Sequence, residues 1–285
     1  MNRLLPILTV VAAIVVLWYG AAVWLNGPWV QDQAARAGVT VSGMDFVGQT
    51  MTQDRPVLPA PHQVIKGLYD GVAGQAITSK KSLIYHGWIT LSGTLLGFVI
   101  GTGLGILLAV GIVHNKAMDL SVMPWAIASQ MIPIIAIAPM LAVVMNSLGA
   151  SGIVTKAIIS AYLSFFPVVV GMVKGLRSPD AMQLDLLRTY SAGEATTLGK
   201  LRLPSSMPYL FASLKVGIAA SLVGAIVGEL NQPAGLGARL LSGSYYGQTV
   251  QIWAALFAAA TMAALLVVGI GRIETVTLRR MGMAR

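Results

Sequence analysis

The sequence is dominated by apolar runs of about 20 residues, the length that a helix needs to cross a hydrocarbon layer of roughly 30 Å. Hydrophobic residues make up 56% of the 285 residues and charged residues only 10%, against roughly 25% charged in ordinary soluble domains. We therefore predict an all-α, polytopic membrane protein with about six transmembrane helices. The predicted spans are approximately 4–25, 89–113, 122–145, 152–174, 208–229 and 250–271.

The first apolar run resembles a signal peptide only superficially. Arg3 precedes it, but the run is longer than a signal-peptide apolar region and lacks a convincing small-residue cleavage site. We interpret residues 1–57 as a retained transmembrane anchor followed by an external segment. Residues 58–285 form the main transmembrane domain, with a cytoplasmic loop at about 177–205.

Basic residues predict the orientation in the membrane. Short cytoplasmic loops carry an excess of Lys and Arg, and six spans put both termini on the same side. The short loop 146–151 has no Lys or Arg, which indicates an external position. With both termini cytoplasmic, the inner side holds Arg3, Lys116, Lys174, Arg177, Arg188, Lys200, Arg202, Arg272, Arg279, Arg280 and Arg285.

Several function classes are disfavoured by composition. Cysteine is absent and the three histidines, His62, His86 and His114, have no metal-ligand spacing, so we expect no metal site and no catalytic site. The net charge of +9 is distributed between apolar spans rather than on a soluble face, so it argues against nucleic acid and for membrane lipid as the surroundings. Before the second span, prolines and helical spacing in 58–72 predict a short external amphipathic helix.

The stretch "SAGEATTLGKLRLP", residues 191–204, contains the pair Gly199-Lys200. A Gly-Lys pair suggests a phosphate-binding loop. A P-loop needs G-x-x-x-x-G-K-[ST]. Here the glycines are one residue too far apart and Leu201 replaces the hydroxyl residue. We predict no nucleotide or other cofactor site in this chain.

The same loop resembles the EAA loop of ABC importer permeases, in which Glu-Ala-Ala, three residues, Gly and nine residues precede Ile-x-Leu-Pro. Counting back from Pro204 places the glycine position on Ser191 and the glutamate position on Asp185, so that Glu194-Ala195 is out of register. "IPIIAIAPMLAVVMNSLG" (132–149), "SFFPVVVGMVKGLRSPD" (164–180) and "VGELNQPAGLGARL" (227–240) resemble family segments in the expected order. The resemblance covers about 58–280 and is nearest the nitrate, sulfonate and taurine type, which also shares an "LPxP" start such as 58–61.

This resemblance implies the type I ABC importer permease fold in a bacterial inner membrane. It also implies a homodimer with a second permease copy, two cytoplasmic ATPase subunits that bind ATP and Mg, and an external substrate-binding protein. The loop would dock on the ATPase, with a short helix that Pro204 stops and orients towards the next span. The predicted coupling residues are Asp185, Ser191, Glu194, Leu201, Leu203 and Pro204.

Four glycines at intervals of four in the second span predict a smooth helix face for close packing; they are Gly93, Gly97, Gly101 and Gly105. Gln130 and Pro133 lie in a proline-rich span, and Ser164 and Phe165 begin the "SFFP" segment. We predict these four, with Glu229, as pathway candidates. Packing or gating explains the "SFFP" residues equally well, and Glu229 is either an interfacial carboxylate that reaches water or part of the outer mouth.

Two other classes of membrane protein are alternatives to an importer permease. A secondary transporter usually shows inverted repeats, broken helices and intramembrane carboxylates, and the predicted spans offer only Glu229. An intramembrane enzyme needs converging catalytic groups, and none are evident. The sequence does not identify the transported solute.

Overall fold

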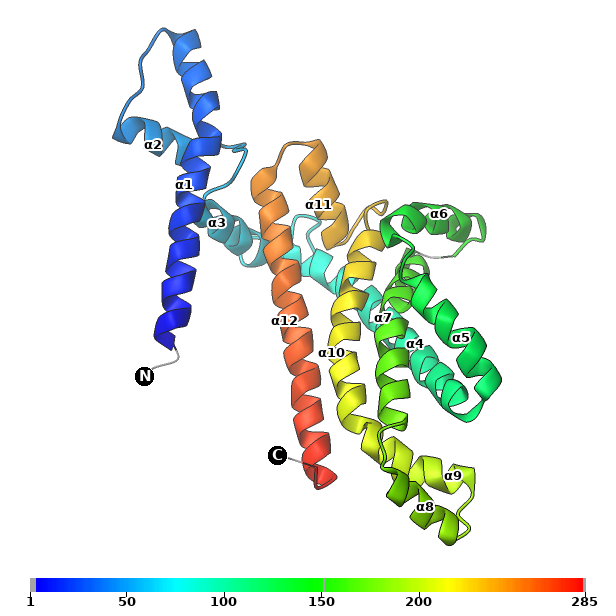
Figure 1. Cartoon of the computed structure of the whole chain (residues 1–285). Coiled ribbons are helices and arrows are strands. Elements are labelled where there is room, and N and C mark those ends of the chain that lie inside the picture. Colours follow the sequence, from blue (N-terminus) through cyan, green and yellow to red (C-terminus); the bar gives the residue numbers. More distant parts are fainter. Residues whose placement is uncertain (1–3, 151, 284–285) are drawn as a thin grey trace. The chain divides into compact units, whose positions relative to one another are not determined.

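The computed structural model describes residues 4–150 and 152–283, and over them its regular secondary structure is helical without strands, as predicted (Figure 1). Its described residues form two compact units. The first contains the chain up to His86 together with Arg239–Ala259, and the second contains Gly87–Ala238 and the chain from Ala260 onward. Five helices are long and apolar enough to cross a membrane, or six if one bent helix pair is a single span.

The first unit begins with α1 (Leu4–Ala37), followed by α2 (Met44–Met51) and α3 (Pro61–Val72). The short amphipathic helix predicted in 58–72 is thus confirmed as α3, and its external position stays a prediction. At 34 residues, α1 continues well beyond the expected span of 4–25 and is longer than a membrane requires. Asn26 explains how the following segment is held against it: its side-chain amide donates to the carbonyls of Thr50 at 3.0 Å and Leu58 at 2.9 Å.

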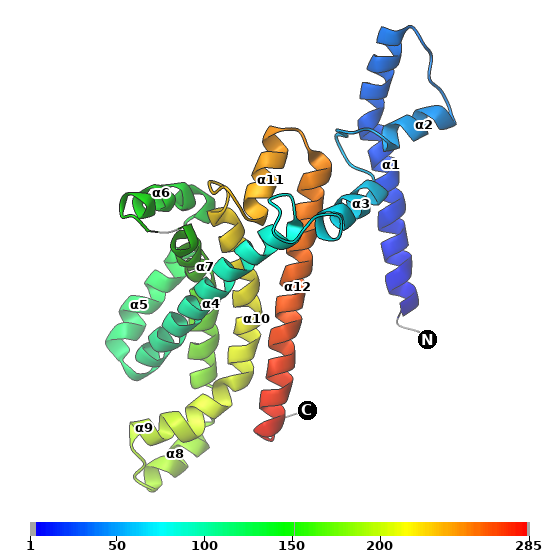
Figure 2. The ribbon, with the colours of Figure 1, turned by 180° about the vertical axis from the view of Figure 1, so that it is seen from behind.

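The second unit is organised around packed parts of three helices: α4 (Leu83–His114), α7 (Gly152–Leu176) and α10 (Leu203–Gly228). One buried cluster joins α4 and α7 through Ala109, Ile112, Val169 and Met172. Small residues allow the close approach of α7 and α10, because Gly171 faces Ser213 and Gly175 faces Ser206. This core occupies the end of the unit from which α8 (Ala181–Thr189) and α9 (Glu194–Thr197) project (Figures 1 and 2). We call this the coupling end.

The span predicted at 122–145 is not one continuous helix. The chain instead forms α5 (Lys116–Ser129) and α6 (Ile134–Ser147), which are bent by 97° at the break between them. Pro133 precedes α6 as its N-cap, and a proline disfavours the helical conformation of the residue before it. The helical path therefore ends before this proline and restarts in another direction.

The bent pair nevertheless returns the chain to the opposite end of the second unit. At the coupling end, Asp119 of α5 forms an ion pair of 2.9 Å with Arg177, just after α7. At the other end, Gly152 of α7 faces the side chain of Gln232, which follows α10. Since α6 leads into α7, α5 and α6 together carry the chain from one end to the other.

The last two helices are α11 (Leu236–Tyr245) and α12 (Thr249–Arg280). Within the second unit, Lys215 of α10 forms an ion pair with Glu274 of α12. Pro208, near the start of α10, and Met283, just after α12, line the same pocket. The C-terminal part of α12 therefore lies at the coupling end.

Candidate functional site

The loop predicted at 177–205 is helical, and its first part is α8. Asp180 is the N-cap of α8, and its backbone N–H donates to the Gln183 side chain at 3.3 Å in a capping box. The helix ends where Ser191 N–H donates to Arg188 O and Ala192 N–H donates to Leu187 O, each at 2.9 Å. Both ends of this short helix are thus defined by local hydrogen bonds.

Ser191 has a backbone φ of 52°, the one positive value among the described non-glycine residues. In the register predicted from the resemblance, this residue stands at the glycine position of the EAA pattern. Left-handed φ is the usual conformation just after a helix, and glycine adopts it most easily because it has no Cβ. The geometry of the turn therefore gives a physical reason for glycine at this position and shows that serine is accommodated with some strain.

One face of α8, continued by its C-cap residue Tyr190, exposes three large apolar side chains. Met182 is 82% exposed, Leu186 57% and Tyr190 77%, and they follow one another at intervals of four residues. Four-residue spacing places them along one side of the helix. Asp185 lies beside this stripe and pairs with Arg188 at 3.0 Å. An unpartnered apolar stripe with charged neighbours is suited to docking against another protein.

The joint between the loop and α10 differs from the prediction that Pro204 stops a short helix. Residues Glu194–Gly228 form one continuous helical path, in which η1 (Leu198–Arg202) is a π-helical turn. Leu203 N–H accordingly donates to Leu198 O, five residues earlier. A proline would clash with the carbonyl four residues before it in a regular helix, and this wider turn accommodates Pro204 without ending the helix.

Several contacts hold this joint against the body of the second unit. Arg202 donates from its guanidinium to the Leu176 carbonyl at the end of α7, at 3.0 Å. Leu198 and Leu203 pack against the buried cluster of α4 and α7. Leu201 is half-buried, while Asp185 and Glu194 are exposed. The coupling candidates therefore divide into exposed residues on the projection and partly buried residues at its base.

The pathway candidates do not converge. Gln130 lies at the bend between α5 and α6 and lines a groove of about 470 Å³ together with Phe166, Lys174 and Tyr209. Pro133 is exposed at the same bend. Sequence analysis missed the groove residues of α7 and α10, because spacing alone does not show which face of an apolar helix lines a groove.

Ser164 and Phe165 lie away from this groove. Ser164 is fully buried, and its position faces Gly101 of α4 and Gly217 of α10. Phe165 packs against the buried cluster at the coupling end. In this structure their contacts are those of helix packing.

Glu229 follows α10 at the end of the unit opposite the coupling end. It is 0% exposed, so the interpretation that it reaches water is wrong for this conformation. Its carboxylate lies 3.3 Å from the ammonium nitrogen of Lys156 in α7, whose side chain is 6% exposed. Sequence analysis missed Lys156, whose only signal was a charge inside an apolar run.

Hydrogen bonds extend this ion pair into a network. Thr90 of α4 donates to Glu229 at 2.8 Å, and the Gly237 backbone N–H donates to the same carboxylate at 3.1 Å. Lys156 also donates to the Ile89 carbonyl at 3.3 Å. The network thus ties together α4, α7, α10 and the start of α11, and it satisfies a buried charge that would otherwise be unfavourable.

The four glycines of α4 lie on the side that faces α7. A Cβ atom at Gly97 would lie 2.6 Å from the Ala157 carbonyl oxygen, one at Gly101 2.7 Å from that of Ala161, and one at Gly105 2.9 Å from that of Phe165. Gly93 faces the Lys156 side chain. The absence of side chains on this stripe is what permits the close approach of the two backbones.

Comparison with known proteins places this arrangement in a family. The family model described as the binding-protein-dependent transport system inner membrane component matches residues 101–282. The chain belongs to this family of ABC importer permeases. The match runs from the middle of α4 to the end of α12 and includes α8, the joint at Pro204 and the buried ion pair.

Individual permeases show the same relationship. The riboflavin transport system permease protein RibX of Chloroflexus aurantiacus is 28% identical over 86% of this chain and 84% of its own length. The formylaminopyrimidine transport permease protein ThiX of Halalkalibacterium halodurans is 30% identical over 64% and 68%. The putative aliphatic sulfonates transport permease protein SsuC of Bacillus subtilis is 22% identical over 81% and 78%. The chain is therefore a multi-pass membrane permease whose relatives are named for different solutes.

Proposed function

We propose that this permease is the membrane-spanning subunit of an ATP-driven importer and carries no catalytic site of its own. It works as a homodimer with two cytoplasmic ATPase subunits, which bind ATP and Mg, and receives its solute from a substrate-binding protein outside the cell. The observation that carries the proposal is the exposed stripe of Met182, Leu186 and Tyr190 on α8. It offers a docking face at the end of a projection that is fixed to the transmembrane helices.

In this proposal α8 is the element on which the ATPase subunit acts. A force applied there reaches the body of the unit through the π-helical turn, the Arg202 contact with Leu176 and the packing of Leu198 and Leu203. Closure of the ATPase dimer would move α8 and, through this joint, α10. Such a transmitted displacement is a recognised way to switch a transporter between two states.

The proposed location is a bacterial inner membrane, with both termini in the cytoplasm. Lys116, Lys174, Arg177 and Arg279 all lie toward the coupling end, where α4 ends and α12 terminates. Six crossings follow if α5 and α6 count as one. A reporter fused after Arg285 should then be active only as a cytoplasmic reporter, and periplasmic activity would contradict this orientation.

For the solute, we propose a small polar molecule of the sulfonate, nitrate, taurine or pyrimidine-precursor kind. Two relatives, named for a formylaminopyrimidine and for aliphatic sulfonates, support the pyrimidine-precursor and sulfonate members of this range, while a third is named for riboflavin, which lies outside it. Retention of a radiolabelled candidate solute by the substrate-binding protein encoded beside this chain tests the choice. Retention of none of these classes would contradict it.

A secondary transporter is the alternative that one observation favours, because charged groups inside a membrane often belong to ion pathways and Lys156 pairs with Glu229 in such a position. Co-purification with the neighbouring ATPase subunit separates the two functions. The importer requires a stable complex, ATP hydrolysis only in the presence of that subunit, and ATP-dependent uptake. Uptake driven by an ion gradient in vesicles without the ATPase would establish the alternative.

A further inference from the structure

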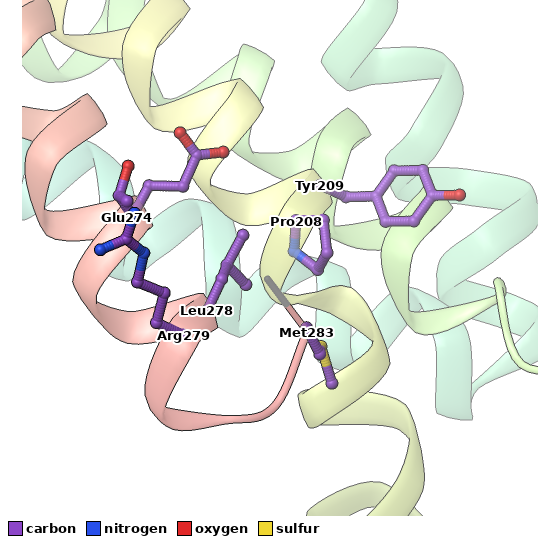
Figure 3. Close-up of a pocket in the computed structure, with 7 residues that line it drawn as sticks. Pro208, Tyr209, Glu274, Leu278, Arg279 and Met283 are labelled. Atoms are coloured by element: carbon purple, nitrogen blue, oxygen red, sulfur yellow. The ribbon is translucent and has the colours of Figure 1, made fainter. Parts of the chain in front are cut away.

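A pocket of about 530 Å³ lies at the coupling end between α10 and the end of α12. Figure 3 shows Glu274, Leu278 and Arg279 on the α12 side, with Pro208 and Tyr209 of α10 across from them. Thr275 and Met283 complete the lining. None of these residues belongs to α8, and Tyr209 alone among them also lines the groove beside Gln130, so the proposed coupling and transport roles leave the α12 side of this pocket unexplained.

The pocket has a positive charge that no carboxylate of its lining balances. The Glu274 carboxylate is already paired with Lys215 of α10. Arg279 is exposed, and no described carboxylate lies within ion-pair distance of it. The remaining charge of the pocket is therefore positive, beside the apolar surfaces of Leu278, Met283 and Pro208.

The outer face of α12 leads from an apolar surface to this charge. Leu265 is 67% exposed and Val268 52% exposed. Arg272 follows Val268 by four residues and Arg279 follows Arg272 by seven, and both arginines are exposed. All four residues therefore lie along one side of the helix. Exposed apolar residues that lead to arginines at a helix end are suited to acyl chains and a headgroup, respectively.

We infer that the pocket binds the headgroup of an acidic phospholipid, whose phosphodiester contacts Arg279 while its acyl chains lie along Leu265 and Val268, with the exposed Arg272 adding positive charge on the same side of α12. Guanidinium groups recognise phosphate oxygens through paired, charge-assisted hydrogen bonds. Basic pockets at the cytoplasmic ends of membrane helices are a known kind of site for acidic lipid headgroups. Lipid binding at this pocket rests on the proposed orientation, in which the coupling end is cytoplasmic, and does not depend on an ATPase partner.

The test uses the full chain, purified in mild detergent and titrated with dioleoylphosphatidylglycerol or dioleoylphosphatidylcholine during native mass spectrometry. We expect preferential retention of phosphatidylglycerol. Arg279→Gln should lower its apparent affinity about fivefold, since a basic residue near an acidic lipid surface contributes about 1 kcal/mol. Arg279→Lys should keep most of the affinity, because it keeps the charge.

Arg280→Gln is the matched control, because it removes the same charge from the neighbouring residue, which does not line the pocket. It should change the affinity less than twofold. An equal loss in both glutamine variants, or equal retention of the two lipids by the unaltered chain, would overturn the inference. Complete competition by glycerophosphoglycerol, which has the headgroup but no acyl chains, would show a soluble phosphate site instead and also contradict it.

Discussion

Lys156 and Glu229, separated by 73 residues in the sequence, form a buried ion pair with an N···O distance of 3.3 Å. The pair belongs to α7 and to the residue that follows α10, and Thr90 and the Gly237 backbone complete the hydrogen bonding of the carboxylate. This contact lies at the opposite end of the second unit from α8. It therefore holds the helices together at the end of the unit that lies away from α8.

Removing one member of this pair should be more harmful than removing both. Lys156→Met leaves the carboxylate buried without its counter-charge, and we expect a loss of about 3–5 kcal/mol in stability. The double variant Lys156→Met, Glu229→Gln should recover much of that loss, because no buried charge remains unpaired. Thermal unfolding of the detergent-solubilised chain measures both, and additive losses in the double variant would contradict a direct pairing.

The glycine face of α4 should not tolerate side chains. Gly97→Leu and Gly101→Leu would place atoms against the backbone carbonyls of Ala157 and Ala161, so we expect a loss of at least about 1–3 kcal/mol and poor recovery of folded protein. Val99 is 67% exposed on the same helix, and Val99→Leu is the matched control. Size-exclusion chromatography and thermal unfolding compare the variants; equal tolerance at all three positions would remove the packing argument.

Ser191 offers a stabilising change. Because its φ is 52°, Ser191→Gly should relieve strain and stabilise the end of α8 by up to about 1 kcal/mol. Ser191→Val should have the opposite effect, since a β-branched side chain is poorly compatible with this conformation. Amide hydrogen exchange of Leu186–Tyr190 measures the local effect, and faster exchange in the glycine variant would argue against strain at this turn.

Pro204→Ala should separate docking from transmission. Alanine restores a backbone N–H and removes the ring that the π-helical turn accommodates, so a regular helix becomes available. We expect the ATPase subunit to remain bound, while stimulation of ATP hydrolysis by the loaded substrate-binding protein falls towards the unstimulated rate. Stimulation equal to that of the unaltered permease would show that the joint does not need the proline.

Sequence patterns predicted the parts of the fold that depend on local chemistry. Apolar length was sufficient for the five continuous spans, and four glycines at four-residue intervals indicated the face of α4 that lies against α7. The missed features depend on tertiary contacts. No spacing rule connects Lys156 to Glu229, and the prolines of 122–145 signalled irregularity without showing that Pro133 would separate two helices bent by 97°.

The joint at Pro204 illustrates the same limit on a smaller scale. A proline usually ends a helix, yet here Leu198 and Leu203 are held by the buried cluster and the helix continues through a wider turn. Local propensity and tertiary packing favoured different outcomes, and packing decided. The register that placed Ser191 at a glycine position came from the resemblance, while the reason for glycine there became clear only from its backbone angle.

The most direct test of the proposed function compares two changes in α8 with one at Lys200, measured as ATPase stimulation by loaded substrate-binding protein in reconstituted vesicles. Leu186→Asp places a charge in the exposed stripe of α8, and Asp185→Lys reverses the charge beside it; both should weaken ATPase binding and reduce stimulation. Lys200→Ala should leave stimulation unchanged, because the Gly-Lys pair has no role in docking. Loss of stimulation in Lys200→Ala, with normal behaviour of the Leu186 and Asp185 variants, would contradict a docking role for α8.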